Sequence, residues 1–560
     1  MRLRWAVRAG LVAAIASWQA MVAGRAEAQP AFRVGSFAKV GGPASQSVPH
    51  ALGVAPRALL LWTAGKVAPG ASSNSLFGLG TSDGVRSSRA LAAAARAGVN
   101  TTSAARRMAL KAITLVDPAQ TVVAEADLAA WDATSFTLDW TANDQNATVI
   151  HYLLIGGGGV SARNVAWQVP SGTGPKSISG VGFRPDVVLT FHVALVGGLA
   201  PPANAVHGNF GLGAMDGSGG QWSSFSFSLD GVSSRGVVSS GRDQVSTAAF
   251  SLLGGLGAAG VLKRAAWSAM NTDGFTLSFT ANDNVATHAW SLALAGVTAK
   301  AGTLAKTTTA GPQAVRGVGF RPGALLLSSA LTSGAPGGLA SVRFALGASD
   351  GGNHGGVALA DVANSQPSIV LARDSNSGAF TKMDNGTGAV EAEARVGSFD
   401  ADGFTLDWTS NDVAAADVAY LALGGGATAP PDAGGAPDAA PPRDGAAAPD
   451  ATALAADGSA GADSGGQPGP GDAARGTDAP ALDASGRSTG DARPLPASTG
   501  VRLRVGCACR AGGAAGGGGL PCILVLLALC RPRGRGRRSA EPPAASHGPR
   551  TASHPGASCC

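Results

Sequence analysis

The sequence predicts an all-β protein: three tandem β-sandwich modules of a jelly-roll-like type, followed by a disordered linker and a C-terminal anchor segment. Three observations support this fold class. Nearly the same nine residues occur three times, as FTLDWTAND from Phe136, FTLSFTAND from Phe275 and FTLDWTSND from Phe404. Apolar and polar residues alternate in each copy, as in a half-buried strand. Glycine accounts for 82 of the 560 residues, which suits short strands joined by frequent turns.

Two further segments precede every copy of this motif in a fixed order, so the unit that repeats is a whole module. They are a GxxP sequence that leads into an apolar run, from Gly53, Gly182 and Gly319, and an FxLGxxDG sequence, from Phe77, Phe210 and Phe344. Equivalent positions lie 129 to 139 residues apart, which is too far for a solenoid repeat and far enough for a domain. We predict three modules, each closing its own apolar interior, over residues 29–160, 161–298 and 299–426.

The residue pattern also assigns strands within each module. In the first copy of the nine-residue motif, Phe136, Leu138 and Trp140 alternate with polar residues and are expected in the core. The Asn-Asp pair that ends the motif predicts a turn, and the Leu-rich segment beyond it predicts the second strand of a hairpin. Unbroken apolar runs predict central strands covered on both faces, over residues 57–62, 186–191 and 323–328. The Ala-rich residues 87–99 look helical instead, and we expect a local variation of module 1 there.

Residues 1–28 have the composition of a secretory signal peptide. Three arginines lie within the first eight residues, an apolar stretch covers residues 11–24, and a small-x-small sequence at 26–28 fits a cleavage site. The chain is therefore expected to be exported, with Gln29 as its first mature residue. All six cysteines lie beyond residue 500, so the exported modules must be stable without disulfides.

The composition changes abruptly after residue 426. Residues 427–500 are rich in Pro, Asp, Ala and Gly and contain no aromatic residue, so they cannot bury enough apolar surface to fold, and we predict a disordered linker. Residues 501–538 contain a pair of cysteines, then an uncharged stretch, then an arginine cluster. A helix of about 20 uncharged residues would just cross the hydrocarbon core, with the arginines on the cytoplasmic side. We predict a C-terminal membrane anchor.

The segment GCACRAGGAAGGGGLPCILVLLALCRPRGRGRR, residues 506–538, resembles the myxobacterial C-terminal sorting signal known as MYXO-CTERM. Proteins with this signal are exported, processed near the cysteine and held at the cell surface. The resemblance implies that Cys507 or Cys509 is the position of processing or lipidation, and that export and sorting machinery are partners. Residues 539–560 continue past the point where such signals usually end and are expected to form a disordered tail. The modules resemble poorly characterised repeats of bacterial surface and phage-related proteins, which implies no particular activity.

The formal net charge of +6 does not predict nucleic-acid binding, because the positive charge lies at the two ends of the chain. Residues 1–28 carry a net charge of +3 and residues 501–560 carry +8, whereas the linker carries −6, so the modules are close to neutral. Binding to phosphates requires positive charge that is clustered on a folded domain. Basic residues beside apolar segments are typical of membrane targeting instead.

The threefold repeat provides a test for catalytic residues, since a site used by every module should keep its residues in every module. The histidines fail this test; His151, for example, aligns with Trp290 and Ala419. A shared metal site or catalytic triad based on histidine is therefore not expected, and no GxSxG, HExxH or P-loop sequence occurs. We predict a protein that is not an enzyme and needs no cofactor.

Two sets of carboxylates pass the test and are the candidate ligands of a metal or a sugar. They are Asp83, Asp216 and Asp350, each followed by Gly, and Asp144, Asp283 and Asp412, each preceded by Asn. If the two turns met, their oxygens could bind Ca²⁺ or sugar hydroxyl groups; the alternative, which we favour, is that both pairs only form turns. Exposed aromatic rings could also stack on a sugar, and the candidates for this role are Trp62, Trp167, Trp222 and Trp267.

These observations predict a non-catalytic protein of the cell surface that binds or adheres through several weak sites. Three equivalent modules on one tether would gain avidity without any strong site, and a glycan or another surface polymer is the expected partner. Two alternatives stay open. Either the modules are spacers or coat elements of the envelope that bind nothing specific, or one module alone carries the site of a surface hydrolase.

Overall fold

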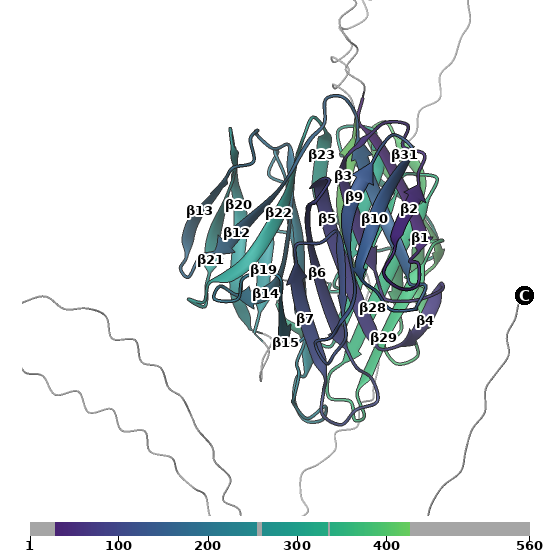
Figure 1. Cartoon of the computed structure of the whole chain (residues 1–560). Coiled ribbons are helices and arrows are strands. Elements are labelled where there is room, and N and C mark those ends of the chain that lie inside the picture. The colour runs from purple at the N-terminus through teal and green to yellow at the C-terminus, as the bar shows by residue number, and fades with distance from the viewer. Residues whose placement is uncertain (1–28, 255–259, 334–336, 426–560) are drawn as a thin grey trace, which may run out of the picture. The chain divides into compact units, whose positions relative to one another are not determined.

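The computed structural model describes residues 29–254, 260–333 and 337–425. Four predicted segments lie outside the described residues, together with Cys507 and Cys509: the signal peptide (1–28), the linker (427–500), the anchor segment (501–538) and the tail (539–560). The described residues form 33 strands in six antiparallel sheets, in which a seven-stranded sheet packs against a four-stranded one three times over (Figure 1). This confirms an all-β fold of three sandwich-like modules. No helix in the described part of the chain is long and apolar enough to span a bilayer.

Each module contributes ten strands to its own two sheets, which are named below in spatial order. In module 1 the larger sheet contains β1 (Ala31–Ala38), β11 (Val149–Gly156), β3 (Pro56–Thr63), β5 (Ser75–Gly84), β6 (Ser87–Ala95) and β7 (Ala104–Ala109), and the smaller contains β2 (Ser45–Pro49), β10 (Ser135–Ala142), β9 (Val122–Trp131) and β8 (Ile113–Val116). In module 2 the larger sheet contains β12 (Ser161–Val169), β22 (Thr287–Ala295), β14 (Val187–Val196), β16 (Phe210–Asp216), β17 (Gln221–Ser228) and β18 (Ser240–Val245), and the smaller contains β13 (Gly174–Ser179), β21 (Gly274–Ala281), β20 (Val261–Asn271) and β19 (Phe250–Leu253). In module 3 the larger sheet contains β23 (Thr298–Ala305), β33 (Asp417–Gly424), β25 (Ala324–Ser329), β27 (Val342–Ser349), β28 (His354–Val362) and β29 (Ile369–Ser375), and the smaller contains β24 (Gly311–Arg316), β32 (Gly403–Ser410), β31 (Val390–Asp400) and β30 (Phe380–Met383).

The seventh strand of every larger sheet belongs to a different module. The donors are β15 (Ala203–Val206) of module 2, which pairs with β7 of module 1, β26 (Leu339–Ala340) of module 3, which pairs with β18 of module 2, and β4 (Gly70–Ser73) of module 1, which pairs with β29 of module 3. We call β4, β15 and β26 the donated strands. Because each module gives a strand to one neighbour and receives one from the other, the three modules close into a ring.

The larger sheets of all three modules face one shared core. Side chains from each of them form a single hydrophobic cluster, within which the rings of Phe77, Phe210 and Phe344 contact one another with centroid separations of 4.7, 4.9 and 5.7 Å. Each module also has a core of its own between its two sheets. The prediction that each module closes its own interior is therefore wrong for one face of the larger sheet. A strand buried against a neighbouring module has the same residue pattern as one buried within its own, so the pattern could not reveal the ring.

The glycine in the FxLG part of the repeated motif brings the two sheets of a module together. A Cβ atom at Gly80, Gly213 or Gly347 would lie within 2.4 Å of the carbonyl oxygen of the residue that immediately precedes β8, β19 or β30. These strands form the edge of the smaller sheet. Only a residue without a Cβ allows so close an approach of the two backbones.

The predicted core strands are confirmed. Phe136, Leu138 and Trp140 of β10 are buried, and they alternate with residues that are partly or fully exposed. The three apolar runs correspond to β3, β14 and β25, which lie between other strands of the larger sheets and are buried on both faces.

The predicted helix over residues 87–99 is wrong. Residues Ser87–Ala95 form β6, a central strand between β5 and β7, and its counterparts in the other modules are β17 and β28. Alanine favours helices only weakly, and in β6 its small side chain fits a strand that is buried on both faces, so packing overrides propensity.

The predicted hairpin is wrong as well. β10 pairs with β2 and β9 in the smaller sheet, whereas β11 pairs with β1 and β3 in the larger one. The Asn-Asp turn therefore carries the chain from one sheet of the sandwich to the other. Alternation identifies the buried face of a strand but not the strand it pairs with.

The shared core predicts that the three modules unfold together. Replacing Phe210 by Ala removes a ring that contacts both Phe77 and Phe344, and we expect a loss of about 3 to 5 kcal/mol in the free energy of unfolding. In a calorimetric scan the three modules should then melt together in one transition at a lower temperature. A separate early transition that accounts for only one third of the unfolding enthalpy would contradict this expectation.

Candidate functional site

The carboxylates of the Asp-Gly pairs join neighbouring modules. The Oδ2 atom of each accepts a hydrogen bond from a backbone N–H in the first strand of the next module around the ring: Asp83 from Asn164 at 2.8 Å, Asp216 from Ala301 at 2.8 Å and Asp350 from Val34 at 3.0 Å. The last of these contacts closes the ring, because it joins module 3 to module 1. Contacts between modules therefore account for the recurrence of this motif.

A buried cation holds the chain beside each donated strand. Arg106 of module 1 donates to the carbonyl oxygens of Val206, His207 and Ala194 in module 2. Arg242 of module 2 donates in the same way to Ala340, Ser341 and Leu331 in module 3. Burial lowers the pKa of both guanidinium groups to about 10, so both stay charged at neutral pH.

At the third junction the cation is a lysine, and it belongs to the module that donates the strand. Lys66 of module 1 donates to the carbonyl oxygens of Ser72, Ser73 and Asn74, at and just beyond β4, at 3.2, 3.2 and 2.9 Å. Burial lowers the pKa of this amine to about 8. The three junctions thus supply a buried cation to backbone carbonyl oxygens in and beside a donated strand, with two different residue types.

The Asn-Asp pair of module 1 surrounds a buried lysine. Lys39, at the end of β1, has a side chain with no exposed surface, and its ammonium donates to Oδ1 of Asn143 and, at 2.7 Å, to Oδ1 of Asp144. The amide nitrogen of Asn143 donates to the carbonyl oxygens of Val40 and Gly42 at 2.7 and 2.6 Å. The Asn side chain therefore ties the β1–β2 connection to the β10–β11 connection, and both connections pass between the two sheets.

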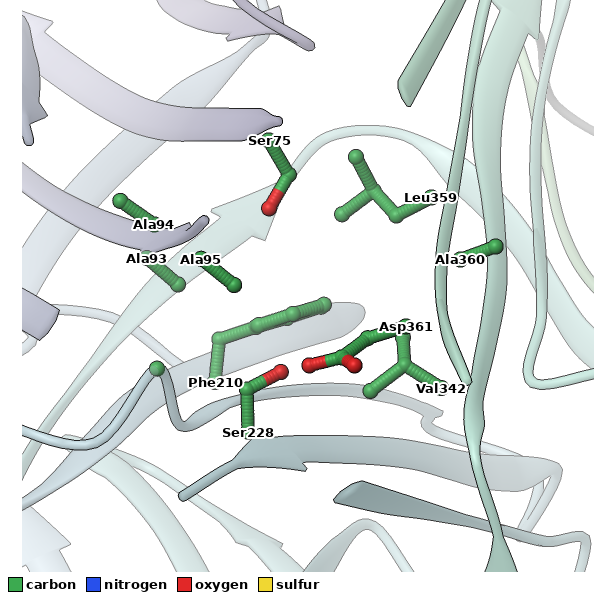
Figure 2. A pocket seen from close by; sticks show the side chains of 11 residues that line it. Ser75, Ala93, Ala94, Ala95, Phe210, Ser228, Val342, Leu359, Ala360 and Asp361 are labelled. Atoms are coloured by element: carbon green, nitrogen blue, oxygen red, sulfur yellow. The ribbon is translucent and has the colours of Figure 1, made fainter. Parts of the chain in front are cut away.

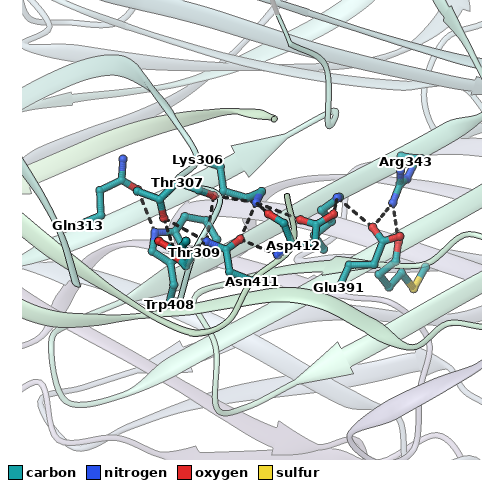
Figure 3. A network of polar contacts seen from close by, with 11 residues as sticks. Lys306, Thr307, Thr309, Gln313, Arg343, Glu391, Trp408, Asn411 and Asp412 are labelled. Atoms are coloured by element: carbon teal, nitrogen blue, oxygen red, sulfur yellow. Dashed lines mark hydrogen bonds and ion pairs between the residues drawn. The ribbon is translucent and has the colours of Figure 1, made fainter. Parts of the chain in front are cut away.

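Module 3 repeats this cluster with additional charges (Figure 3). Lys306, at the end of β23, contacts Asn411 at 2.5 Å and Asp412 at 3.0 Å. Lys382 also contacts Asp412, and it forms an ion pair with Glu391 at 3.0 Å. Burial alone would raise the pKa of Asp412, but the hydrogen bonds and charges of Lys382 and Lys306 outweigh it, so that this pKa is lowered.

Module 2 builds the same cluster from a different strand. Lys263 of β20, whose side chain has no exposed surface, contacts Asn282 at 2.7 Å and also pairs with Asp283. Pro170 occupies the position that holds Lys39 in module 1 and Lys306 in module 3. We call the three groups the Lys–Asn–Asp clusters: Lys39, Asn143 and Asp144; Lys263, Asn282 and Asp283; Lys306, Asn411 and Asp412.

The aromatic residue near each Lys–Asn–Asp cluster differs between modules in step with the position of the lysine. In modules 1 and 3, where the lysine follows the first strand, its ammonium nitrogen lies 5.6 Å from the centroid of a tryptophan ring. The indole N–H of this tryptophan donates to a glutamine: Trp140 to Gln46 and Trp408 to Gln313. In module 2, Phe279 and Lys176 occupy these two positions. Sequence reasoning missed the lysines because their positions do not recur in all three modules, although this correlated change was visible in the repeats.

The structure does not bring the two sets of aspartates together as a metal site. The Asp-Gly carboxylates are engaged by backbone N–H groups at the junctions, and the Asn-Asp carboxylates are paired with lysines. Across the described ranges, no group of three His, Cys, Asp or Glu side chains is placed to hold a metal ion.

Three of the four tryptophans considered as stacking platforms are not exposed. Trp62, Trp167 and Trp222 are buried in the cores, and the indole N–H of Trp222 donates to the carbonyl oxygen of Tyr420 across a junction. Trp267 is partly buried and packs against the core of module 2. Isolated aromatic residues in the sequence therefore mark packing between sheets and modules in this protein.

A small cavity lies among equivalent positions of the three modules. It is lined by Ser75, Gly208 and Val342, each of which lies two residues before a phenylalanine of the shared core, and it has a volume of about 10 Å³, enough for about one water molecule (Figure 2). The Asp361 carboxylate points toward Ser228 at this cavity. Burial raises the pKa of Asp361 to about 6, although hydrogen bonds from Ser228 and Ser240 oppose the shift.

One histidine is fully buried at the junction of modules 3 and 1. The Nε2 atom of His151 lies 2.9 Å from Oδ2 of Asp374, and neither side chain has exposed surface. The pair links β11 of module 1 to β29 of module 3. Neither side chain is accessible from solvent in this structure.

No model of a protein family matches the chain, and no curated protein matches it.

Asp361 makes the stability of the three-module ring depend on pH. Its pKa is raised from 3.8 to about 6, so the folded state holds this proton more tightly than the unfolded chain, and the stability present below pH 4 is lost as the pH rises through 6. The buried charge costs about 2 to 3 kcal/mol at pH 8. In urea unfolding, Asp361→Asn should therefore be more stable than the wild type at pH 8, with the advantage disappearing at pH 4.

Asp132 provides a control, because its pKa is shifted in the opposite direction. Hydrogen bonds from Thr134 and Ser135 lower the pKa of this exposed carboxyl to about 2, so Asp132→Asn should lose stability at pH 8. An Asp361→Asn protein that is less stable than the wild type at pH 8 would show that the carboxylate is stabilised by partners other than Ser228 and Ser240.

Proposed function

We propose that the three modules form the exported, non-catalytic head of a cell-surface protein that binds a glycan or another surface polymer at several equivalent positions. The observation that supports this proposal is the outward face of the three smaller sheets. Residues that alternate with the buried positions of β10, β21 and β32 are partly or fully exposed and nearly identical: Thr137, Asp139 and Thr141; Thr276, Ser278 and Thr280; Thr405, Asp407 and Thr409. Hydroxyl and carboxylate groups are the hydrogen-bonding partners that sugar hydroxyls need.

The ring supports a multivalent mechanism. The donated strands and the shared core hold the three polar faces on one body, so a polymer that leaves one face still has two others nearby. Such an arrangement raises the overall affinity without any new contact. The Asp residues of the turns are engaged in contacts within the ring, which fits weak individual sites.

The location proposed for the head follows from the sequence. Residues 1–28 direct export, and residues 501–538, with Cys507 or Cys509 as the processing position, attach the chain to the membrane with the help of the sorting machinery. Residues 427–500 would then connect the head to this anchor.

A structural role in the envelope is the second candidate. The recurrent charged and amide side chains of the turns are used for contacts within the ring, which is what a spacer or coat element needs. A surface hydrolase has less support, because the buried His151–Asp374 pair is closed to substrates.

The number of working faces can be reduced only within the intact ring, because an excised module would lack its donated strand. We therefore propose single, double and triple combinations of Thr141→Arg, Thr280→Arg and Thr409→Arg, which cover three equivalent exposed positions. Binding of the head to isolated envelope polysaccharide should weaken roughly tenfold with each face lost, because each loss removes one of the linked contacts.

The matched control is Val413→Arg, which places the same side chain at a residue that is 86% exposed in the connection between β32 and β33. This variant should bind like the wild type. If the triple variant also binds like the wild type, or if the wild type binds no envelope polymer, the spacer is the better account.

A further inference from the structure

Each module places one buried lysine amine against an asparagine side-chain amide, with a carboxylate beside both. We propose that these lysines form covalent isopeptide bonds with the asparagines, joining Lys39 to Asn143, Lys263 to Asn282 and Lys306 to Asn411. The proposal concerns cross-links within the modules and does not depend on what the head binds.

The contacts bring the reacting groups together in all three modules. The ammonium nitrogen reaches the amide oxygen of the asparagine in each cluster, at 2.7 Å for Lys263 and 2.5 Å for Lys306, and in closer contact for Lys39. All three lysine side chains have no exposed surface. Reactants that are held in contact and shielded from water gain a large effective concentration.

The asparagine amides are also held in a fixed orientation. Each Nδ2 donates to two backbone carbonyl oxygens of the loop after the first strand of its module, at 2.6 to 2.9 Å. With the nitrogen turned to these carbonyls, the oxygen and the carbonyl carbon face the lysine. The amine is therefore held beside the amide, and a small movement from the oxygen to the face of the amide plane brings it to the Cγ atom.

The neighbouring aspartate can move the protons that the reaction requires. Asp144 lies 2.7 Å from the Lys39 ammonium, Asp412 lies 3.0 Å from that of Lys306, and Asp283 contacts Lys263. The carboxylate accepts a proton from the ammonium, and the free amine then attacks the Cγ atom of the asparagine. The carboxyl group returns this proton to Nδ2, the C–Nδ2 bond breaks, and the nitrogen leaves as ammonia. The carboxylate then accepts the second proton from the lysine nitrogen, which keeps one hydrogen as the N–H of the new amide, and this proton passes to the ammonia, so that ammonium is released. One amide bond is formed and one is broken, so no oxidant or other reactant is needed.

The lysine comes from a different strand in module 2 than in modules 1 and 3, which argues that the amine–amide contact is what the three modules share. Modules 1 and 3 supply the lysine from the end of their first strand, whereas module 2 has Pro170 there and supplies Lys263 from β20. The amine reaches the same asparagine in either case. A simple counter-ion for the aspartate would not require contact with the amide, and Lys382 shows this, because its contacts are with Asp412 and Glu391.

The cross-links would stabilise a region that lacks cysteine. In modules 1 and 3 the bond would connect the end of the first strand to the connection between the last two strands, closing a loop of about a hundred residues. A covalent link of this kind restricts the unfolded chain as a disulfide does, and it is not sensitive to reduction.

Peptide mapping of the purified, non-reduced full chain tests the proposal directly. Trypsin cannot cleave after an acylated lysine, so we expect branched peptides that contain each lysine with its asparagine, and the mass of each should equal the sum of its two linear peptides minus one ammonia. Lys66 and Lys382 are internal controls, since both are buried without contact to these asparagines, and trypsin should cleave after them once the chain is denatured. Linear peptides that end at Lys39, Lys263 or Lys306 in stoichiometric yield would overturn the proposal for that module.

Two variants separate the chemistry from folding. Lys306→Met removes the bond in module 3 and should leave the other two branched peptides intact. Asp412→Asn keeps both reacting groups and removes the proton acceptor, so the bond of module 3 should form about 100-fold more slowly or not at all. If Asp412→Asn yields the branched peptide as fast as the wild type, the assigned role of the carboxylate is wrong.

Discussion

No larger sheet in this protein is completed by its own module. The edge strand β7, β18 or β29 leaves a row of backbone N–H and C=O groups unpaired until a donated strand arrives from a neighbour. Open edges of this kind invite pairing with other chains, and closing three of them against one another removes the hazard within a single molecule. The position of the Asp-Gly turns, the buried arginines and Lys66 all follow from this constraint, because each secures the chain that crosses a junction.

Closure also determines where polar and apolar residues can lie. The inward face of each larger sheet packs on the shared core, and its outward face packs on the smaller sheet, so only the smaller sheets keep a face toward solvent. The connections between the two sheets hold further charged groups, the aspartates of the Lys–Asn–Asp clusters. A proposed binding surface and a proposed cross-link thus occupy different parts of each module, and a change to one need not disturb the other.

The sequence predicted which face of a strand is buried, but it did not predict which strand or module each strand contacts. Alternation identified β10 and its buried aromatic residues, and unbroken apolar runs identified β3, β14 and β25 as central strands. It could not show that β10 and β11 belong to different sheets, nor that Phe77, Phe210 and Phe344 meet, because a side chain has the same chemistry whichever element covers it. The candidate aspartates were found by recurrence, but their lysine partners come from different strands in different modules, and recurrence alone therefore missed them.

The exchange of strands between modules is tested most directly by amide hydrogen exchange in the full chain. Strands β4 and β15 pair only with another module in the described structure, so their hydrogen-bonded amides should exchange as slowly as those of β7 and β29. Slow exchange in these strands is the result that the closed ring predicts. Exchange of β4 and β15 at the rate of an exposed loop, with the central strands still protected, would show that the modules stand side by side without exchanging strands.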